Sequence, residues 1–172
     1  MLLTDQSAVA ALWFLPFVIP IAIWVAWSDM ARMKIPNLAV LALVLVFAVV
    51  GLVVVWTGTW SLELWGWRWV HLAVMMVIGF VANMARAMGA GDAKFFAAMA
   101  LFISRSDALM FVYLLAAMVL LGFALHRLAR ASSWVRDRTP DWESWVRKDF
   151  PMGLCLASTL VVYLAAGALW GT

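Results

Sequence analysis

The distribution of apolar residues constrains this chain more than any other feature. Long apolar runs alternate with short polar segments, and they fall at about residues 9–27, 37–57, 67–87, 93–104, 107–126 and 151–170. A helix needs roughly 20 apolar residues to cross a bilayer, and all but 93–104 are long enough. Because 67% of the 172 residues are hydrophobic, a soluble domain of this size could not bury them. We predict an all-α polytopic membrane protein with one membrane-embedded domain over residues 1–172.

The charged residues predict how the chain crosses the membrane. If the amino terminus is outside and the chain crosses six times, all Lys and Arg residues except Arg68 and Arg105 lie on the cytoplasmic side. That distribution follows the positive-inside rule. A re-entrant 93–104 segment would instead place the basic stretch 127–148 outside. We therefore predict about six transmembrane helices with a short fourth span. The first run lacks a preceding basic residue, so we expect it to stay as a span and not to act as a cleaved signal.

Two connecting segments have a pattern of their own. In 126–150, Thr139-Pro140 is typical of a helix start, and apolar residues recur at helical spacing from Trp142 to Phe150. We predict a short amphipathic helix on the cytoplasmic leaflet there, which anchors the chain to lipid or, alternatively, docks a partner. On the other face, the Trp-rich stretch 60–69 is predicted to form an aromatic belt around a loop.

Two aspartates call for a specific explanation, because ionisable groups at membrane depth are costly. Most of the nine acidic residues, Asp107 among them, fall in predicted loops, where a solvated charge is ordinary. Asp29 and Asp92 instead adjoin apolar runs on the predicted cytoplasmic side. Asp29 has a structural alternative, an ion pair with Arg32 or Lys34 that anchors the topology.

The sequence around each aspartate predicts a local structure. After Asp29, Pro36 disfavours helix at the preceding residue, and Asn37 is predicted to cap the next span. Asp92 follows two glycines, Gly89 and Gly91, which we predict to supply unusual backbone angles and to let another chain approach closely. The structural alternative for Asp92 is that it caps the fourth helix, partnered by Lys94.

Two carboxyl groups on separate helices at one leaflet predict a proton-sharing pair. Like charges close together cannot both ionise, so one carboxyl stays protonated near neutral pH. The ionised partner can then take a proton from water while the protonated one polarises a peptide carbonyl. This is the chemistry of an aspartic protease, and it requires neither metal nor cofactor.

Other classes of function find little support in the sequence. Cys155 is the single cysteine, and His71 and His126 are predicted to lie at opposite faces, so we expect no metal site. Motifs of serine nucleophiles and of phosphate-binding loops are missing from the sequence. The net charge is only +3 and its basic residues are dispersed, so we expect no nucleic-acid partner.

Three stretches of the chain resemble the type IV prepilin peptidases, membrane proteases of the Gly-x-Gly-Asp class. They are "SDMARMKIPN" (28–37), "GAGDAKFFAA" (89–98) and "FPMGLCLA" (150–157), in the family's order. The resemblance implies that Asp29 and Asp92 are the catalytic aspartates. It also implies that Pro151 and Gly153 shape the substrate channel, and we add Gly89, Gly91, Lys94, Pro36 and Asn37 as residues that bind substrate or shape the site.

The resemblance further implies a substrate and a location. The family removes the basic leader of prepilins after a glycine, on the cytoplasmic side of the bacterial inner membrane and before a hydrophobic stem. Larger members carry paired Cys-x-x-Cys motifs linked to methylation, whereas this chain has only Cys155. It therefore resembles the small, peptidase-only branch associated with Flp or tight-adherence pili, and we expect no methyltransferase activity.

Two other classes of function are compatible with paired membrane aspartates. The chain could be a small transporter subunit in which Asp29 and Asp92 bind a proton or a cation. It could also be a non-catalytic assembly protein of a pilus or secretion machine.

Overall fold

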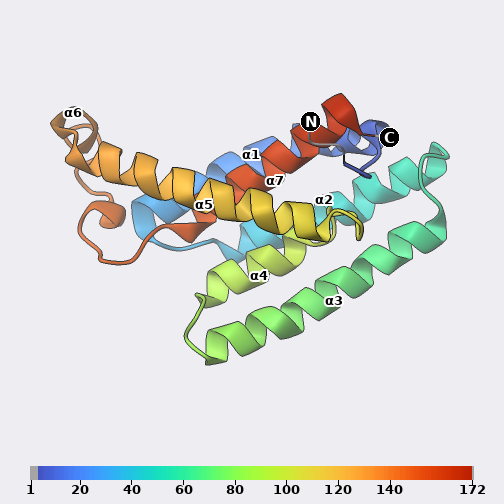
Figure 1. Cartoon of the computed structure of the whole chain (residues 1–172), viewed down its shortest axis with the longest axis horizontal. Coiled ribbons are helices and arrows are strands. Elements are labelled where there is room, and N and C mark those ends of the chain that lie inside the picture. Colours follow the sequence, from blue (N-terminus) through green and yellow to red (C-terminus); the bar gives the residue numbers. More distant parts are fainter. Residues whose placement is uncertain (1–3, 172) are drawn as a thin grey trace.

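The computed structural model describes residues 4–171, and they form helices joined by short loops (Figure 1). In chain order the helices are α1 (Ala8–Arg32), α2 (Asn37–Trp56), α3 (Leu62–Met84), α4 (Ala90–Met99), α5 (Ala108–Ala131), α6 (Ser133–Arg136), the 3-10 helix η1 (Glu143–Trp145) and α7 (Met152–Trp170). Within the described residues the only β pairing is an isolated bridge between Thr4 and Gly171. The fold class is all-α, as predicted.

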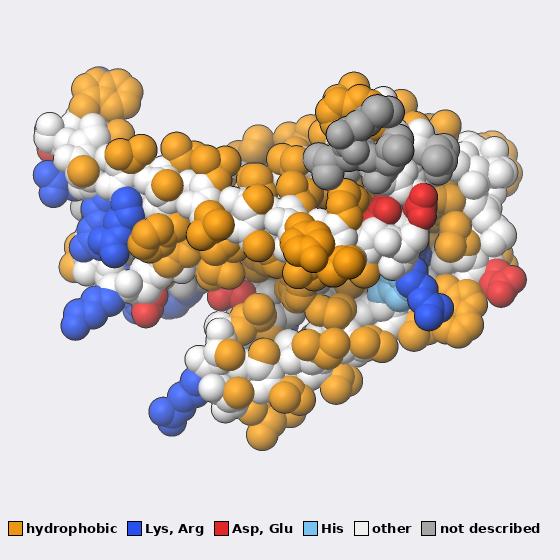
Figure 2. All heavy atoms as spheres, viewed as in Figure 1, with side chains coloured by type: hydrophobic (Ala, Val, Ile, Leu, Met, Phe, Trp, Pro, Cys, Tyr) orange, Lys and Arg blue, Asp and Glu red, His pale blue; other side chains and the backbone are white. Residues whose placement is uncertain are grey.

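Five of these helices are long and apolar enough to cross a membrane: α1, α2, α3, α5 and α7. They confirm the prediction of a polytopic membrane protein. The ten-residue α4 rises only about 15 Å and cannot span a bilayer as a helix alone. On the face seen in Figure 2, hydrophobic side chains cover the long helices, and Lys and Arg lie mainly toward the ends of the molecule. Such a surface is suited to contact with lipid.

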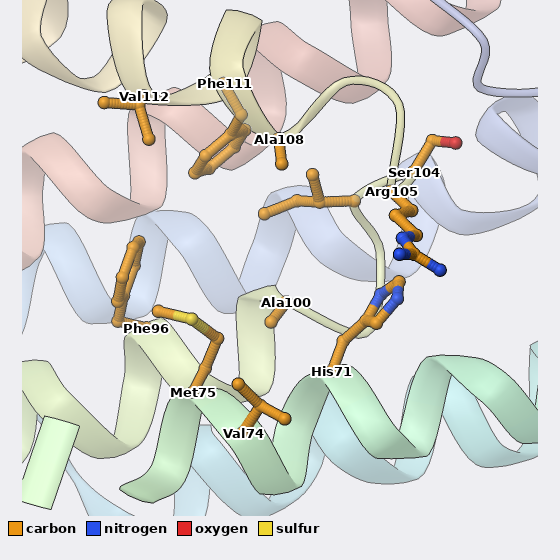
Figure 3. A pocket seen from close by; sticks show the side chains of 11 residues that line it. His71, Val74, Met75, Phe96, Ala100, Ser104, Arg105, Ala108, Phe111 and Val112 are labelled. Carbon is orange, nitrogen blue, oxygen red and sulfur yellow. The ribbon is translucent and has the colours of Figure 1, made fainter. Parts of the chain in front are cut away.

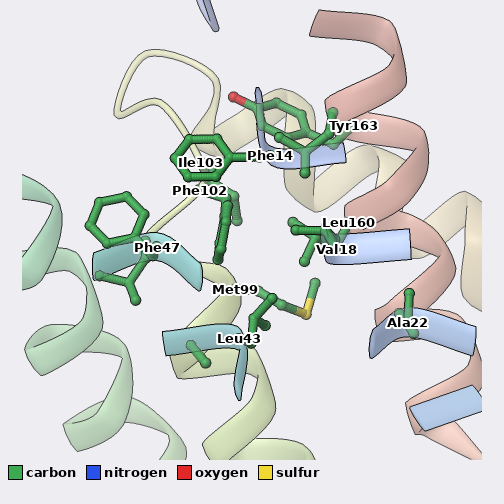
Figure 4. Close-up of a cluster of buried hydrophobic side chains, with 14 of the residues drawn as sticks. Phe14, Val18, Ala22, Leu43, Phe47, Met99, Phe102, Ile103, Leu160 and Tyr163 are labelled. Atoms are coloured by element: carbon green, nitrogen blue, oxygen red, sulfur yellow. The ribbon is translucent and has the colours of Figure 1, made fainter. Parts of the chain in front are cut away.

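The core lies where α1, α2, α4 and α7 meet (Figure 4). The ring of Phe14 on α1 packs edge-on against Phe102, with 5.0 Å between centroids, and stacks on Phe47 of α2 at 5.9 Å. Met99 and Leu160, from α4 and α7, are fully buried in the same cluster. This packing fixes α1 and α4 relative to each other, and these are the two helices that carry Asp29 and Asp92.

The third span begins earlier than predicted. The Ser61 side chain accepts a 3.0 Å hydrogen bond from the backbone N–H of Leu64, so it caps α3 at its first turn. Glu63 lies in that turn, where a negative charge is favoured by the helix dipole. The stretch 60–69, predicted to form an aromatic belt around a loop that ends at the third span at about 67, is instead helical from Leu62 onward.

The long polar segment forms less helix than predicted. Between α5 and α7 there are only the four-residue α6 and the 3-10 turn η1. Thr139 does not cap a helix, because its hydroxyl donates to the carbonyl oxygen of Val135 at 2.9 Å. The indole Nε1 of Trp145 donates to the carbonyl oxygen of Thr139 at 2.9 Å, which folds the segment back on itself. The amphipathic spacing here reflects this compact loop.

A buried polar cluster holds together the end of the bundle where the chain termini lie. Asp107 is 5% exposed and accepts hydrogen bonds at 2.8 Å from both Thr4 Oγ1 and Tyr163 OH. The backbone N–H of Ser104 donates in turn to Tyr163 at 3.0 Å. Asp107 is thus not the solvated loop residue predicted, because distant segments converge on it.

Candidate active site

The end of α1 brings Asp29 to the site. Met33 adopts a left-handed conformation with φ of 52°, and its N–H donates to the carbonyl oxygen of Asp29 at 2.8 Å, so the helix ends there. The Ser28 hydroxyl donates to the carbonyl oxygen of Lys34 at 2.9 Å and ties the reversed chain back onto the helix. Pro36 then serves as N-cap of α2. Asp29 is left one turn from the helix end, pointing into the protein.

Asp29 is buried against the amino terminus of α7. Its side chain is 5% exposed, and Oδ2 accepts a 2.6 Å hydrogen bond from the backbone N–H of Gly153. The free N–H groups of a first helical turn and the helix dipole both favour a carboxylate at this position. Within residues 4–171, Asp29 forms no ion pair with Arg32 or Lys34, and the Arg32 guanidinium lies 5.4 Å from the ring centre of Trp27 instead.

Gly153 is the residue type that this contact requires. A Cβ at position 153 would lie 2.9 Å from Oδ2 of Asp29 and 3.0 Å from its Cγ. Any larger residue would therefore displace the carboxyl group. Pro151 is the buried N-cap of α7, and its missing N–H costs nothing at a helix start. Of the two residues predicted to shape the site, Gly153 lies directly against Asp29, and Pro151 begins the helix that carries Gly153.

Asp92 reaches the site from the first turn of α4. Gly89 is the N-cap, and Asp92 is the third residue inside the helix, so Asp92 is not the cap considered from the sequence. Neither Gly89 nor Gly91 has a positive φ, and the prediction of unusual backbone angles is wrong. The glycines provide room instead. A Cβ on Gly89 would lie 2.7 Å from Oδ2 of Asp92, and one on Gly91 would lie 3.4 Å from the Cβ of Ile35.

Lys94 and Asn37 contact each other at the rim of the site. Lys94 Nζ donates to Asn37 Oδ1 at 3.4 Å and links α4 to the start of α2. Asn37 is not the cap of α2, because Pro36 occupies that position. Among the described residues, Lys94 has no ion pair with Asp92.

Both aspartates line one open cavity of about 320 Å³. Its lining consists of Asp29, Met33, Lys34, Ile35, Asn37, Gly89, Ala90, Gly91, Asp92 and Lys94. Asp92 comes from the first turn of the short α4, and Asp29 from the last turns of the long α1. A cavity with two carboxyl groups is suited to acid–base chemistry on a bound chain.

Of the residues predicted for the site, the cavity brings together Asp29, Asp92, Gly89, Gly91, Lys94 and Asn37. Pro36 adjoins it as the cap of α2, and Gly153 reaches it through its hydrogen bond to Asp29. Sequence reasoning missed Ile35, whose side chain faces Gly91. Its place between the aspartate turn and Pro36 is the only sequence signal that could have indicated it.

The comparison with known families gives a match over most of the chain. Residues 16–125 match the model of the type IV leader peptidase family, and this range contains both Asp29 and Asp92. No curated protein and no solved structure gave a match.

Proposed function

This chain belongs to the type IV leader peptidase family, a family of peptidases, and from that membership we propose that it removes the basic leader of type IV or Flp-type prepilins. In this proposal the bond after a glycine is cut, ahead of the apolar stem of the substrate. The observation that carries it is the shared cavity of Asp29 and Asp92. Two carboxyl groups at one opening are the minimum that aspartic protease chemistry requires.

The proposed reaction uses the two carboxyl groups in opposite protonation states. As the ionised carboxylate takes a proton from water, the water oxygen bonds to the peptide carbonyl carbon. The protonated carboxyl gives its proton to the carbonyl oxygen, which yields a neutral diol. When the diol collapses, the C–N bond breaks, the leaving nitrogen receives the proton that water had lost, and a diol hydroxyl returns the other proton to its carboxylate. The pair ends as it began.

The surroundings of Asp29 and Asp92 support these roles. The Gly153 N–H orients the Asp29 carboxyl group, since a hydrogen bond of 2.6 Å leaves little freedom of rotation. Gly89 and Gly91 line the cavity beside Asp92 without side chains of their own, which favours the close approach of an extended peptide backbone. A site fixed in this way loses little entropy when it orients the reacting groups.

We place the site on the cytoplasmic side of the bacterial inner membrane. The positive-inside rule supports this, because it puts the amino terminus outside and the basic connections around Asp29 and Asp92 inside. The short segment 93–104 then acts as the fourth of six spans. Residues 93–99 of this segment belong to α4, and the turns that follow bury Leu101 and Phe102 in the protein core. Non-helical backbone at membrane depth must be buried in protein in this way.

The test is to express the chain together with a candidate prepilin and to compare the precursor and mature bands. Asp29→Asn and Asp92→Asn retain side-chain shape but cannot exchange a proton, so each should slow cleavage by about 10³-fold or more. Arg32→Ala is the matched control, because Arg32 stacks on Trp27 outside the cavity. Full processing by either amide variant, with the protein still in the membrane, would exclude the carboxyl pair.

A further inference from the structure

An apolar groove separates α3 from α5 (Figure 3). It encloses about 250 Å³ and is lined from α3 by Val74 and Met75, and from α5 by Phe111 and Val112. Phe96 of α4 and Ala100, the C-cap of that helix, also line it. Only at one end does the lining become polar, where His71 and Arg105 lie close together in Figure 3.

The two helices beside this groove are the least buried of the five long apolar helices. Over their most apolar stretches only 11% of α3 and 6% of α5 is buried, against 33% to 56% for α1, α2 and α7. In Figure 1, α3 diverges from α5, and the short α4 lies between them. Because α4 is ten residues long, it cannot fill the space between helices more than twice its length. The groove is therefore an opening in the side of the bundle.

The groove is aligned with the candidate active site through one face of α4. Asp92, Phe96 and Ala100 follow one another at intervals of four residues, which places them on the same side of the helix. Asp92 lines the cavity of the carboxyl pair, and the other two line the groove. A chain lying along this face of α4 would thus pass from the groove directly to the carboxyl groups.

We propose that this groove binds the apolar helix of the substrate, entering sideways from the membrane and lying parallel to α4 with its amino-terminal end at Asp92. This inference rests on the proposed function, because it assigns the occupant as the segment that follows the cut bond. An apolar helix fits the aliphatic and aromatic lining, which offers almost no polar partner between Phe96 and His71. Alignment with Asp92 favours a substrate, since lipid or a second copy would gain nothing from reaching a carboxyl pair.

The geometry predicts the register of the bound helix. Two parallel helices both rise about 1.5 Å per residue, so the substrate residue about four positions after the cut bond lies beside Phe96. The residue about eight positions after it lies beside Ala100, at the level of the groove. Substrate positions halfway between these two would face away from α4, because successive contacts on a helix recur every three or four residues.

Cross-linking tests this register. In a Cys155→Ser, Asp29→Asn background, which removes the native thiol and preserves the uncut precursor, single cysteines are placed by Val74→Cys or Val112→Cys. Precursors carry one cysteine at successive positions of the stem, and disulfide formation is measured in membranes. We expect maximal cross-linking about eight positions after the bond, with helical periodicity. Val81→Cys and Leu109→Cys are the controls, since both lie on the same helices, are well exposed and do not line the groove.

A kinetic experiment tests the same groove in the active enzyme. Val74→Trp and Val112→Trp should raise the KM for the stem-containing precursor about tenfold or more, because both side chains are about half exposed and a larger one would fill the groove. Because both positions are half exposed, the larger Trp side chains should not disturb the packing of the helices. Val81→Trp and Leu109→Trp should leave KM within twofold of the wild type.

The outcomes separate this inference from the proposed function. If the wild type cuts the precursor but neither cross-links nor changes in KM single out the groove, the inference fails and the proposed function stands. Cross-links that join two copies of the enzyme through position 74 or 112, in place of enzyme to precursor, would also overturn it. If the wild type cuts no precursor of this kind, the proposed function itself falls.

Discussion

The backbone N–H of Gly153 donates a 2.6 Å hydrogen bond to Oδ2 of Asp29, across 124 positions of the chain. This bond joins the last helix to the first and fixes one carboxyl group of the candidate pair. Because α1 and α7 are packed along their length, the bond depends on the whole bundle and not on a local turn. It makes position 153 the most sensitive place at which to test the site without altering a carboxyl group.

Gly153→Ala is expected to reduce cleavage by up to ~100-fold, because the new methyl group would displace the Asp29 carboxyl and small misplacements of catalytic groups have effects of that size. The measurement is the rate of precursor processing in membranes containing equal amounts of enzyme. Gly66→Ala is the matched control, since a Cβ there has no atom within 4 Å, and it should process normally. Equal rates for the two variants would show that the Asp29–Gly153 contact is unimportant.

Gly89→Ala should impair cleavage more than Gly91→Ala. The Cβ at position 89 would lie 2.7 Å from Oδ2 of Asp92, whereas the one at position 91 would lie at 3.4 Å from Ile35, close to ordinary contact. Since the Asp92 carboxyl can rotate away, we expect a loss of activity with little loss of stability. Processing rates and thermal unfolding in detergent, measured on both variants, check this. The reverse order of activity would contradict it.

Lys94→Ala is expected to slow processing by roughly two- to fivefold, which corresponds to the modest energy of an exposed hydrogen bond. Because Asn37 is the partner of Lys94, Asn37→Ala should slow processing to a similar degree. The double variant should process the precursor only slightly more slowly than either single variant. A complete loss of cleavage in Lys94→Ala would instead assign the lysine a direct part in the chemistry.

Tyr163→Phe should destabilise the protein by about 1–3 kcal/mol, because it removes a donor from the buried carboxyl of Asp107 and an acceptor from the N–H of Ser104. The apparent unfolding temperature in detergent measures this. Tyr113→Phe is the control, since Tyr113 is well exposed on α5 and should leave that temperature unchanged. Tyr163 lies in the polar cluster that includes Asp107 and not in the cavity of Asp29 and Asp92, so the folded variant should retain its KM. An unchanged unfolding temperature would show that the cluster contributes nothing to stability.

The sequence alone predicts the all-helical membrane fold and singles out Asp29 and Asp92 as the candidate site residues. In lipid, apolar runs of bilayer length can form all their backbone hydrogen bonds only as helices. A carboxyl group beside such a run is costly to place at membrane depth, so it indicates a functional site. Local patterns were less reliable. Ser61 starts α3 within the stretch predicted to be a loop, and the spacing from Trp142 to Phe150 belongs to a folded loop with one 3-10 turn. In both places, capping and tertiary contacts outweighed the apolar pattern.

Only the tertiary structure decided which partners the charged groups have. Asp29 is nearer in sequence to Arg32 and Lys34 than to Gly153, yet α7 brings it an N–H group. Asp107 is buried because segments from both ends of the chain converge on it, and the glycines beside Asp92 provide space where the sequence suggested unusual backbone angles. A sequence shows which groups need a partner, but the choice of partner depends on contacts between distant segments, and packing alone determines those.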